Sequence, residues 1–296
     1  MLDGIKIDPI AFTIPIGDGF PIYWYGIIVT IGIAIGVLWG AREIAKRNQN
    51  VDEFFNGLII VIFSGYLFAR LTYVLLEVFA GRGNQFQTLL DVINIRSGGI
   101  NILGGFIGAA IVGWLYLRWR RLNFWHYADV AGPAVLIAQG IGRWGNFINQ
   151  ELYGPPTTRP WGILIDEPYR LPQYADLVQF PLETTRFHPT FLYESIWLIL
   201  GFVVLVALNS RFRDRWRPGT LFGIFLIWWG AGRAFLEFFR ADQPTIGSSP
   251  ITYSFLMALA LALAGVWVVL SRNDRMPQIF GRRRQRVVKP KPRRQN

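Results

Sequence analysis

The hydrophobic residues of this chain gather in long blocks rather than in short alternating segments. A helix needs about twenty apolar residues to cross the roughly 30 Å core of a bilayer, and the blocks have this length. Asp129, Pro133 and Gln139 interrupt the fourth block, but the loops around it still require a crossing there. The pattern predicts an all-α, polytopic membrane protein with about seven transmembrane helices. The blocks cover residues 22–41, 55–79, 98–117, 127–147, 189–209, 218–239 and 250–270.

Basic residues alternate between the connecting loops. The segments 42–54, 118–126 and 210–217, together with the tail from residue 271, hold 20 Lys and Arg residues, whereas the opposite loops hold 7. Cytoplasmic loops carry the excess of basic residues in membrane proteins. We therefore expect a multi-pass protein of the cell (cytoplasmic or inner) membrane, with its N-terminus outside and its C-terminus in the cytoplasm.

Two segments outside the blocks differ from them in composition. Residues 148–187 contain several charges, but also Trp161, Ile165 and Phe180, which favours an ordered cap on the outer side over a linker. The predicted organisation is a seven-helix transmembrane domain over 1–270, which includes this cap, followed by a basic cytoplasmic tail over 271–296. A second soluble domain is not expected.

Charge and cysteine content narrow the classes of function. The formal net charge is +11, and the tail contributes +9 of it through ten basic residues and one acid. Beside a membrane helix, such a tail is expected to bind an anionic lipid surface rather than nucleic acid. Cysteine is absent, which excludes disulfides, thiolate metal sites and a cysteine nucleophile. The first twenty residues lack the basic and apolar regions of a signal peptide, so we expect no cleavable one.

Charged side chains inside a bilayer cost from about 3 to over 10 kcal/mol, so they are candidates for function. In "IGRWGNFINQ", Arg143, Asn146 and Asn149 recur every three residues, which places them on roughly one face of a helix. Gly142 and Gly145 leave room beside the arginine for a ligand headgroup, and a guanidinium binds two phosphate oxygens at once. The alternative is an interfacial arginine that extends toward the outer headgroups.

A second group lies in "GRAFLEFFR". Arg233, Glu237 and Arg240 stand at positions i, i+4 and i+7, which form one stripe of a helix. Arg233 and Glu237 alone would make a structural ion pair at the membrane edge. Because Glu237 cannot neutralise both arginines, one positive charge remains for an anion.

A third group is "FHPTFLYE", at the start of the fifth block. His188 precedes Pro189, and Tyr193 and Glu194 follow within the block. A lone histidine at this place is usually a polar helix cap, and the residues alone favour that interpretation. Near an outer active site, the same imidazole would handle a proton at neutral pH.

Softer polar and glycine features lie in the first three blocks. Tyr25, in "YWYG", fits an interfacial aromatic belt, and Arg70 with Tyr73 forms an i, i+3 polar pair. In "GGINILGGFIG", Gly104 and Gly108 form a small-xxx-small pair, which more often marks close helix packing than a ligand site.

All three charged groups lie toward the outer face in the predicted topology. Their excess positive charge, beside glycine and aromatic residues, indicates binding of an anionic lipid headgroup. The residues alone do not choose between an enzyme and a carrier that acts on a phospholipid.

The stretch "GRWGNFINQELYG" closely resembles the signature of bacterial prolipoprotein diacylglyceryl transferases. The family also carries a Tyr-Gly near the first helix, an Arg and Tyr in the second, a doubled-glycine segment in the third, and His-Pro…Tyr-Glu and Arg…Glu-Phe-Phe-Arg motifs. All of them occur here in the family's order, from residue 23 to about 245. The matching signature residues are Arg143, Asn146, Asn149, Glu151 and Gly154.

This resemblance implies transfer of the diacylglyceryl group of phosphatidylglycerol to the lipobox cysteine thiol of a preprolipoprotein signal peptide, the first step of lipoprotein maturation. A thioether forms and glycerol phosphate leaves; the resemblance implies no metal or cofactor, and we expect a monomer. Arg143 and Arg233 would bind the phosphate and stabilise its charge as it departs, with His188 as the candidate base. Substrate binding would fall to Tyr25, Arg70, Asn146, Asn149, Glu151, Gly154, Glu237 and Arg240.

Two positions depart from the family pattern. Many members have a histidine, proposed as the base for the thiol, where this chain has Leu103, and often a tyrosine where it has Trp229. Either His188 serves as the base, or an electropositive pocket lowers the thiol pKa without one. The competing functions are a non-catalytic carrier of anionic phospholipid, an ester-cleaving acyltransferase, and a lipid-binding sensor or scaffold.

Overall fold

The computed structural model describes residues 7–17, 19–93, 98–240, 249 and 251–275. Long helices dominate this part of the chain. They are α1 (Trp24–Lys46), α2 (Val51–Phe79), α4 (Ile102–Trp119), α5 (Phe124–Ile148), α6 (Thr190–Phe212), α7 (Thr220–Leu236) and α8 (Tyr253–Arg272). The short elements are β1 (Ile10–Ile14), β2 (Phe20–Tyr23), α3 (Leu89–Ile93) and the 3-10 helices η1 (Gly83–Gln85), η2 (Glu167–Tyr169), η3 (Pro172–Tyr174) and η4 (Glu237–Phe239).

Each predicted hydrophobic block coincides with one long helix, which confirms a polytopic all-α membrane protein. Six helices of the described residues are long and apolar enough to cross a membrane, and α5 is not among them. With 25 residues α5 is long enough, but it carries Asp129, Gln139 and Arg143. The weakness predicted for the fourth block therefore has a physical origin, because this helix bears much of the polar chemistry described below.

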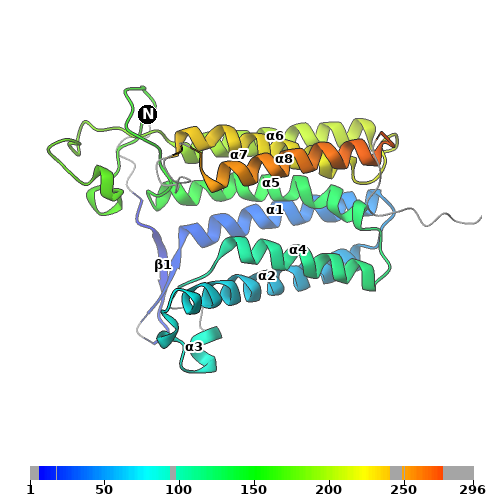
Figure 1. Ribbon diagram of the computed structural model, residues 1–296, viewed down its shortest axis with the longest axis horizontal. Coiled ribbons are helices and arrows are strands. Elements are labelled where there is room, and N and C mark those ends of the chain that lie inside the picture. Colours follow the sequence, from blue (N-terminus) through cyan, green and yellow to red (C-terminus); the bar gives the residue numbers. More distant parts are fainter. Residues whose placement is uncertain (1–6, 18, 94–97, 241–248, 250, 276–296) are drawn as a thin grey trace, which may run out of the picture.

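The long helices lie side by side along the length of the molecule (Figure 1). Helix α5 runs between α1 and the group formed by α6, α7 and α8, while α2 and α4 make a pair on the other side of α1. The cap segment and the β1–β2 hairpin lie at one end of the bundle. In the hairpin, Phe12 pairs with Ile22 and Ile14 with Phe20 in antiparallel register. This hairpin was not predicted from the sequence.

Glycines let neighbouring helices approach closely. A Cβ atom on Gly32 or Gly36 of α1 would lie 2.8 or 2.7 Å from the carbonyl oxygen of Ala138 or Ala134 in α5. A side chain on Gly104 of α4 would overlap α2 in the same way. The small residues are therefore required for packing, as the sequence pattern predicted for α4.

Polar residues fix where several helices begin. The side chains of Asn50, Asn101, Asn123 and Thr252 each accept a hydrogen bond from a first-turn backbone N–H, of α2, α4, α5 and α8 respectively. Such caps satisfy amides that have no partner inside the helix. They fix the residue at which each of these helices begins.

The cap has a small core of its own. Tyr153, Ile163, Ile165 and Phe187 are buried and pack with Phe191 from the first turn of α6. Residues 148–187 are thus an ordered layer anchored on the bundle, although they contain no long helix. The division at residue 270 remains a prediction, since 276–296 of the basic tail, like Lys6 and Arg96 of the outer loops, fall outside the described residues.

Candidate active site

One buried carboxylate gathers three arginines at the end of the bundle that carries the cap. Glu194 of α6 is only 5% exposed. Its Oε2 lies 2.6 Å from Nε of Arg143, and its Oε1 lies 3.8 Å from Nη1 of Arg233 and 3.6 Å from Nη1 of Arg240. The arginines of two separate sequence motifs, on α5 and on α7 with the segment after η4, therefore belong to one cluster.

Local helix geometry explains why these side chains meet. Arg143 lies in the penultimate turn of α5, Glu194 near the start of α6 and Arg233 in the last turn of α7, so all three reach the same end of the bundle. Close packing fixes α5 on α6, because Ser195 of α6 donates a 2.8 Å hydrogen bond to the carbonyl of Gly140.

Glu237 is the second carboxylate of the cluster. Its Oε2 lies 2.8 Å from Nη2 of Arg233, one helical turn away, and its Oε1 accepts a 2.5 Å hydrogen bond from Thr252 at the start of α8. In the ion pairs of the described residues, three guanidinium groups therefore face two carboxylates. Helix α7 ends at Leu236 and η4 at Phe239, so Arg240 lies beyond the single helical stripe that the sequence predicted. Guanidinium groups gathered at one place still suit an anion.

The polar residues that follow Arg143 form a chain of hydrogen bonds. Arg143 donates from Nη1 to Oδ1 of Asn146 at 3.4 Å, and Asn146 donates to Oε1 of Glu151 at 2.8 Å. Asn149 donates to the same oxygen at 3.3 Å. The helical face predicted for these residues is confirmed, and it turns into the cap at the exposed Glu151.

Tyr25 and Gly154 border the cluster through packing. A Cβ atom on Gly145 would lie 2.6 Å from the ring of Tyr25, so the first turn of α1 rests on α5 beside Arg143. An open groove of about 700 Å³, lined mostly by apolar residues, runs from Tyr25 to Asn149. Gly154 is buried where any side chain would collide with the backbone of Phe239, the residue before Arg240.

His188 lies in a different set of contacts. Its Nδ1 is 3.0 Å from the hydroxyl of Tyr193, which accepts a 2.7 Å hydrogen bond from the indole N–H of Trp161. Hydrogen bonds and ion pairs among the described residues do not join His188 to the arginines. Nδ1 either accepts from this hydroxyl or donates to it, depending on the tautomer of the imidazole. Burial, followed by the charge of Arg159, lowers the pKa of His188 and favours its neutral form.

Arg70 is placed apart from the cluster. Its guanidinium is buried and donates to four backbone carbonyls, those of Asp91, Val92, Gly98 and Gly99, at 2.6 to 2.8 Å. These contacts join α2 to α3 and to Gly98 and Gly99, which precede α4. The predicted role of Arg70 in substrate binding stays a prediction, and the geometry gives it a structural role beside it.

The two positions that depart from the family pattern lie in ordinary surroundings. Leu103 is in the first turn of α4 and is 50% exposed. Trp229 donates from its indole N–H to Oε1 of Gln139 at 2.9 Å, which satisfies one polar group of α5.

Sequence reasoning missed the central residue of the cluster. Glu194 was noticed inside a hydrophobic block, but its neighbour His188 attracted the functional interpretation. An ionisable residue within a membrane-spanning segment is by itself a signal of function. Thr252, which contacts Glu237, carried no such signal, because a helix cap accounts for it fully.

A bundle of membrane-spanning helices with a buried arginine–carboxylate cluster under an ordered cap defines an integral membrane protein with a site for an anionic group. Residues 9–271 match the sequence family described as prolipoprotein diacylglyceryl transferase, and the chain belongs to this family. The phosphatidylglycerol–prolipoprotein diacylglyceryl transferase of Bacillus cereus is 39% identical over 254 residues, which are 86% of this chain and 89% of that protein. Proteins of the same name from Bacillus mycoides and Bacillus anthracis are each 38% identical over the same shares. The family resemblance predicted from the motifs is confirmed.

Proposed function

We propose that this protein transfers the diacylglyceryl group of phosphatidylglycerol to the lipobox cysteine of a preprolipoprotein. The peptide sulfur forms a bond to the terminal glycerol carbon of the diacylglyceryl group, and the bond between that carbon and the phosphate oxygen breaks. The thiol releases its proton to water, a thioether forms, and glycerol phosphate leaves with the bonding electron pair. The products are a diacylglyceryl-modified peptide and one glycerol phosphate.

The convergence of Arg143, Arg233 and Arg240 on Glu194 is the observation that carries this proposal. The phosphodiester carries one negative charge, and the departing phosphate monoester carries up to two. Guanidinium groups fixed in advance stabilise such a developing charge most effectively, because they need no reorganisation during the reaction. We assign Arg143 and Arg233 to the phosphate, and Arg240 and Glu237 to the orientation of the headgroup and of the arginines.

The groove beside Tyr25 supports a lipid as the substrate. Its walls are largely apolar, and they include Asn149, which contacts Glu151 near the cluster. A lipid headgroup at the arginines would therefore have an apolar surface within reach for its chains. Tyr25, Asn146, Asn149, Glu151 and Gly154 would border the headgroup, as the family motif implies.

The nucleophile in this proposal is the thiol of the peptide, which agrees with a chain that contains no cysteine. A thiol near fixed positive charge has a lowered pKa, so a larger fraction is present as the thiolate. Nδ1 of His188 faces the hydroxyl of Tyr193, and the hydrogen bonds and ion pairs of the described residues do not join this histidine to the arginines. We therefore favour activation of the thiol by the cluster rather than by His188.

The charge distribution supports an orientation in the cell membrane. The end of the bundle opposite the cluster is rich in basic residues, including Lys46, Arg120, Arg213 and Arg272. Because basic ends face the cytoplasm, the cluster and the cap would face outward, where secreted lipoprotein precursors emerge. The monomeric state expected from the sequence stays a prediction.

The proposal is tested with purified protein, phosphatidylglycerol labelled in its diacylglyceryl part, and two lipobox peptides that differ only by Cys or Ser. We expect label on the Cys peptide alone, with one glycerol phosphate released for each peptide modified. Lipid that binds or crosses between leaflets without any transfer to the Cys peptide would instead support a carrier.

A further inference from the structure

A second polar site lies at the end of the bundle opposite the arginine cluster. A cavity of about 170 Å³ opens where α1 and α6 end and where α5 and α7 begin. The ionisable side chains in its wall are four basic ones and two acidic ones, together with a histidine. They are Lys46, Arg47, Arg213, Arg217, Asp129, Asp214 and His126.

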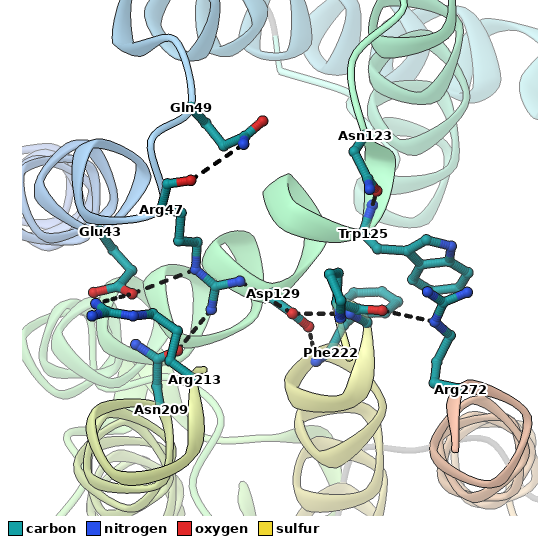
Figure 2. Close-up of polar contacts among 12 residues, drawn as sticks. Glu43, Arg47, Gln49, Asn123, Trp125, Asp129, Asn209, Arg213, Phe222 and Arg272 are labelled. Atoms are coloured by element: carbon teal, nitrogen blue, oxygen red, sulfur yellow. Dashed lines mark hydrogen bonds and ion pairs between the residues drawn. The ribbon is translucent and has the colours of Figure 1, made fainter. Parts of the chain in front are cut away.

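Arg47 forms the floor of this cavity and is held from three sides (Figure 2). Its Nε lies 3.4 Å from Glu43, its Nη1 lies 3.3 Å from Asp129, and its Nη2 donates to Asn209 at 2.7 Å. Asp129 in turn accepts hydrogen bonds of 2.9 and 2.8 Å from the amides of Gly219 and Phe222, at the start of α7. The carboxylates of Glu43 and Asp129 therefore already have partners within this network.

The cations at the rim retain hydrogen-bonding capacity. Lys46 has a side chain that is 63% exposed, and its ammonium lies 3.9 Å from Glu43, beyond hydrogen-bond distance. Arg213 approaches Glu43 through Nη1 at 3.4 Å and Asp214 through Nε at 3.6 Å. Among the described residues, Nη2 of Arg213 takes part in no hydrogen bond or ion pair. The fully exposed Asp214 competes weakly for this guanidinium, since surface ion pairs contribute little.

One wall of the cavity carries an unsatisfied polar atom. Among the described residues, the buried Nδ1 of His126, which lines the cavity, has no hydrogen-bond partner. Buried polar atoms are nearly always paired, so this atom indicates a polar species in the cavity. An imidazole N–H is able to donate a hydrogen bond to an oxygen anion.

We propose that this cavity binds a phosphate group, either that of an anionic phospholipid in the adjacent leaflet or free phosphate. Basic pockets between membrane helices at the cytoplasmic side are suited to lipid headgroups. Arg213, Lys46 and His126, which all line the cavity, would contact the phosphate. The proposal is independent of the transferase reaction, because its residues lie at the other end of the helices.

The test measures retention of dioleoyl phosphatidic acid by the full-length protein, using native mass spectrometry after exchange into phosphatidylcholine nanodiscs. Lys46→Gln and Arg213→Gln each remove one rim cation. Arg215→Gln is the matched control, because it removes the same charge from the same exposed loop outside the cavity wall. Lys46→Gln also guards against misfolding, since its side chain is largely exposed.

We expect both rim variants to weaken phosphatidic acid binding about tenfold, as the loss of a charge-assisted hydrogen bond implies, and Arg215→Gln to weaken it threefold at most. Inorganic phosphate that displaces the lipid only at high concentration would identify the lipid as the ligand, whereas tight phosphate binding sensitive to Arg213→Gln would identify the free anion. Equal losses in the rim variants and in Arg215→Gln would overturn the proposal. So would a loss confined to Arg143→Ala, which places the bound lipid at the other end.

Discussion

Replacement of Glu194 by glutamine tests whether the arginine cluster depends on this carboxylate. The substitution keeps the shape of the side chain and removes one buried negative charge, at a residue that is 5% exposed. The 2.6 Å contact with Arg143 is a charge-assisted hydrogen bond, and such bonds contribute about 1.5–3 kcal/mol. Breaking a buried ion pair by removing one partner costs about 3–5 kcal/mol. The amide of glutamine recovers part of this through its oxygen, so about 3 kcal/mol is the magnitude to expect.

The loss is expected in turnover more than in lipid affinity. If about 3 kcal/mol of arginine orientation is lost in the transition state, kcat falls on the order of 100-fold, at 1.36 kcal/mol for each tenfold. The three arginines keep their charge and still attract the phosphate, so KM for phosphatidylglycerol changes by less than about tenfold. Initial rates of label transfer to a lipobox peptide, measured over a range of lipid concentrations, separate the two constants.

Glu183→Gln is the matched control, because Glu183 is exposed in the cap. It should transfer label at the rate of the unmodified protein, and Glu194→Asp should recover part of the activity that Glu194→Gln loses. A kcat for Glu194→Gln within threefold of the unmodified value, in a folded sample, would refute the role given to this carboxylate.

Three further predictions concern stability, each read from thermal unfolding in detergent. Burial lowers the pKa of His188 below its usual value near 6.5, so its neutral form stabilises the fold fully above about pH 6.5 and less as the pH falls. His188→Gln should therefore reduce the loss of Tm between pH 7.5 and 5.5. A pH profile of Tm that His188→Gln leaves unchanged would contradict this. Arg70→Met leaves four carbonyls without a donor and should lower the free energy of unfolding by about 3 kcal/mol. Arg82→Met, at an exposed ion pair, should lower it by under about 1 kcal/mol. Equal losses of stability would argue against a structural role for Arg70. Gly104→Ala should lower the free energy of unfolding by about 1–3 kcal/mol, because its new Cβ overlaps α2. Gly65→Ala should be tolerated, since the nearest neighbour of its new Cβ is 3.6 Å away. A tolerated Gly104→Ala would show that the helices α2 and α4 can separate.

The membrane architecture was predictable because the bilayer imposes a length and a polarity on each segment. The hydrophobic blocks coincide with the long helices, and the helical spacing of Arg143, Asn146 and Asn149 placed them on one face. The β1–β2 hairpin was not predictable in this way, because residues 10–23 hold two prolines and two glycines and show no clear alternation.

The candidate site was predictable in its parts but not in its connections. One motif identified Arg143 and another identified Arg233 with Arg240, and only the packing of α5, α6 and α7 brings them to one carboxylate. The same limit applies to Arg70, whose intramembrane charge indicated a ligand while its actual partners are carbonyls more than twenty residues away in the chain. The network around Arg47 and Asp129 was missed, since its members come from loops and helix ends that pair only in three dimensions.

The most direct test of the central claim is the rate of diacylglyceryl transfer to the Cys peptide by Arg143→Ala, compared with Arg82→Ala. Arg82 lies on an exposed loop and pairs only with Glu77 in the described contacts, so it controls for the loss of one arginine. The account predicts that Arg143→Ala lowers transfer by at least about 100-fold, as expected for removal of a fixed donor to a developing charge, while Arg82→Ala transfers normally. Transfer by a folded Arg143→Ala protein at the rate of Arg82→Ala would contradict the assignment of the arginine cluster to the phosphate.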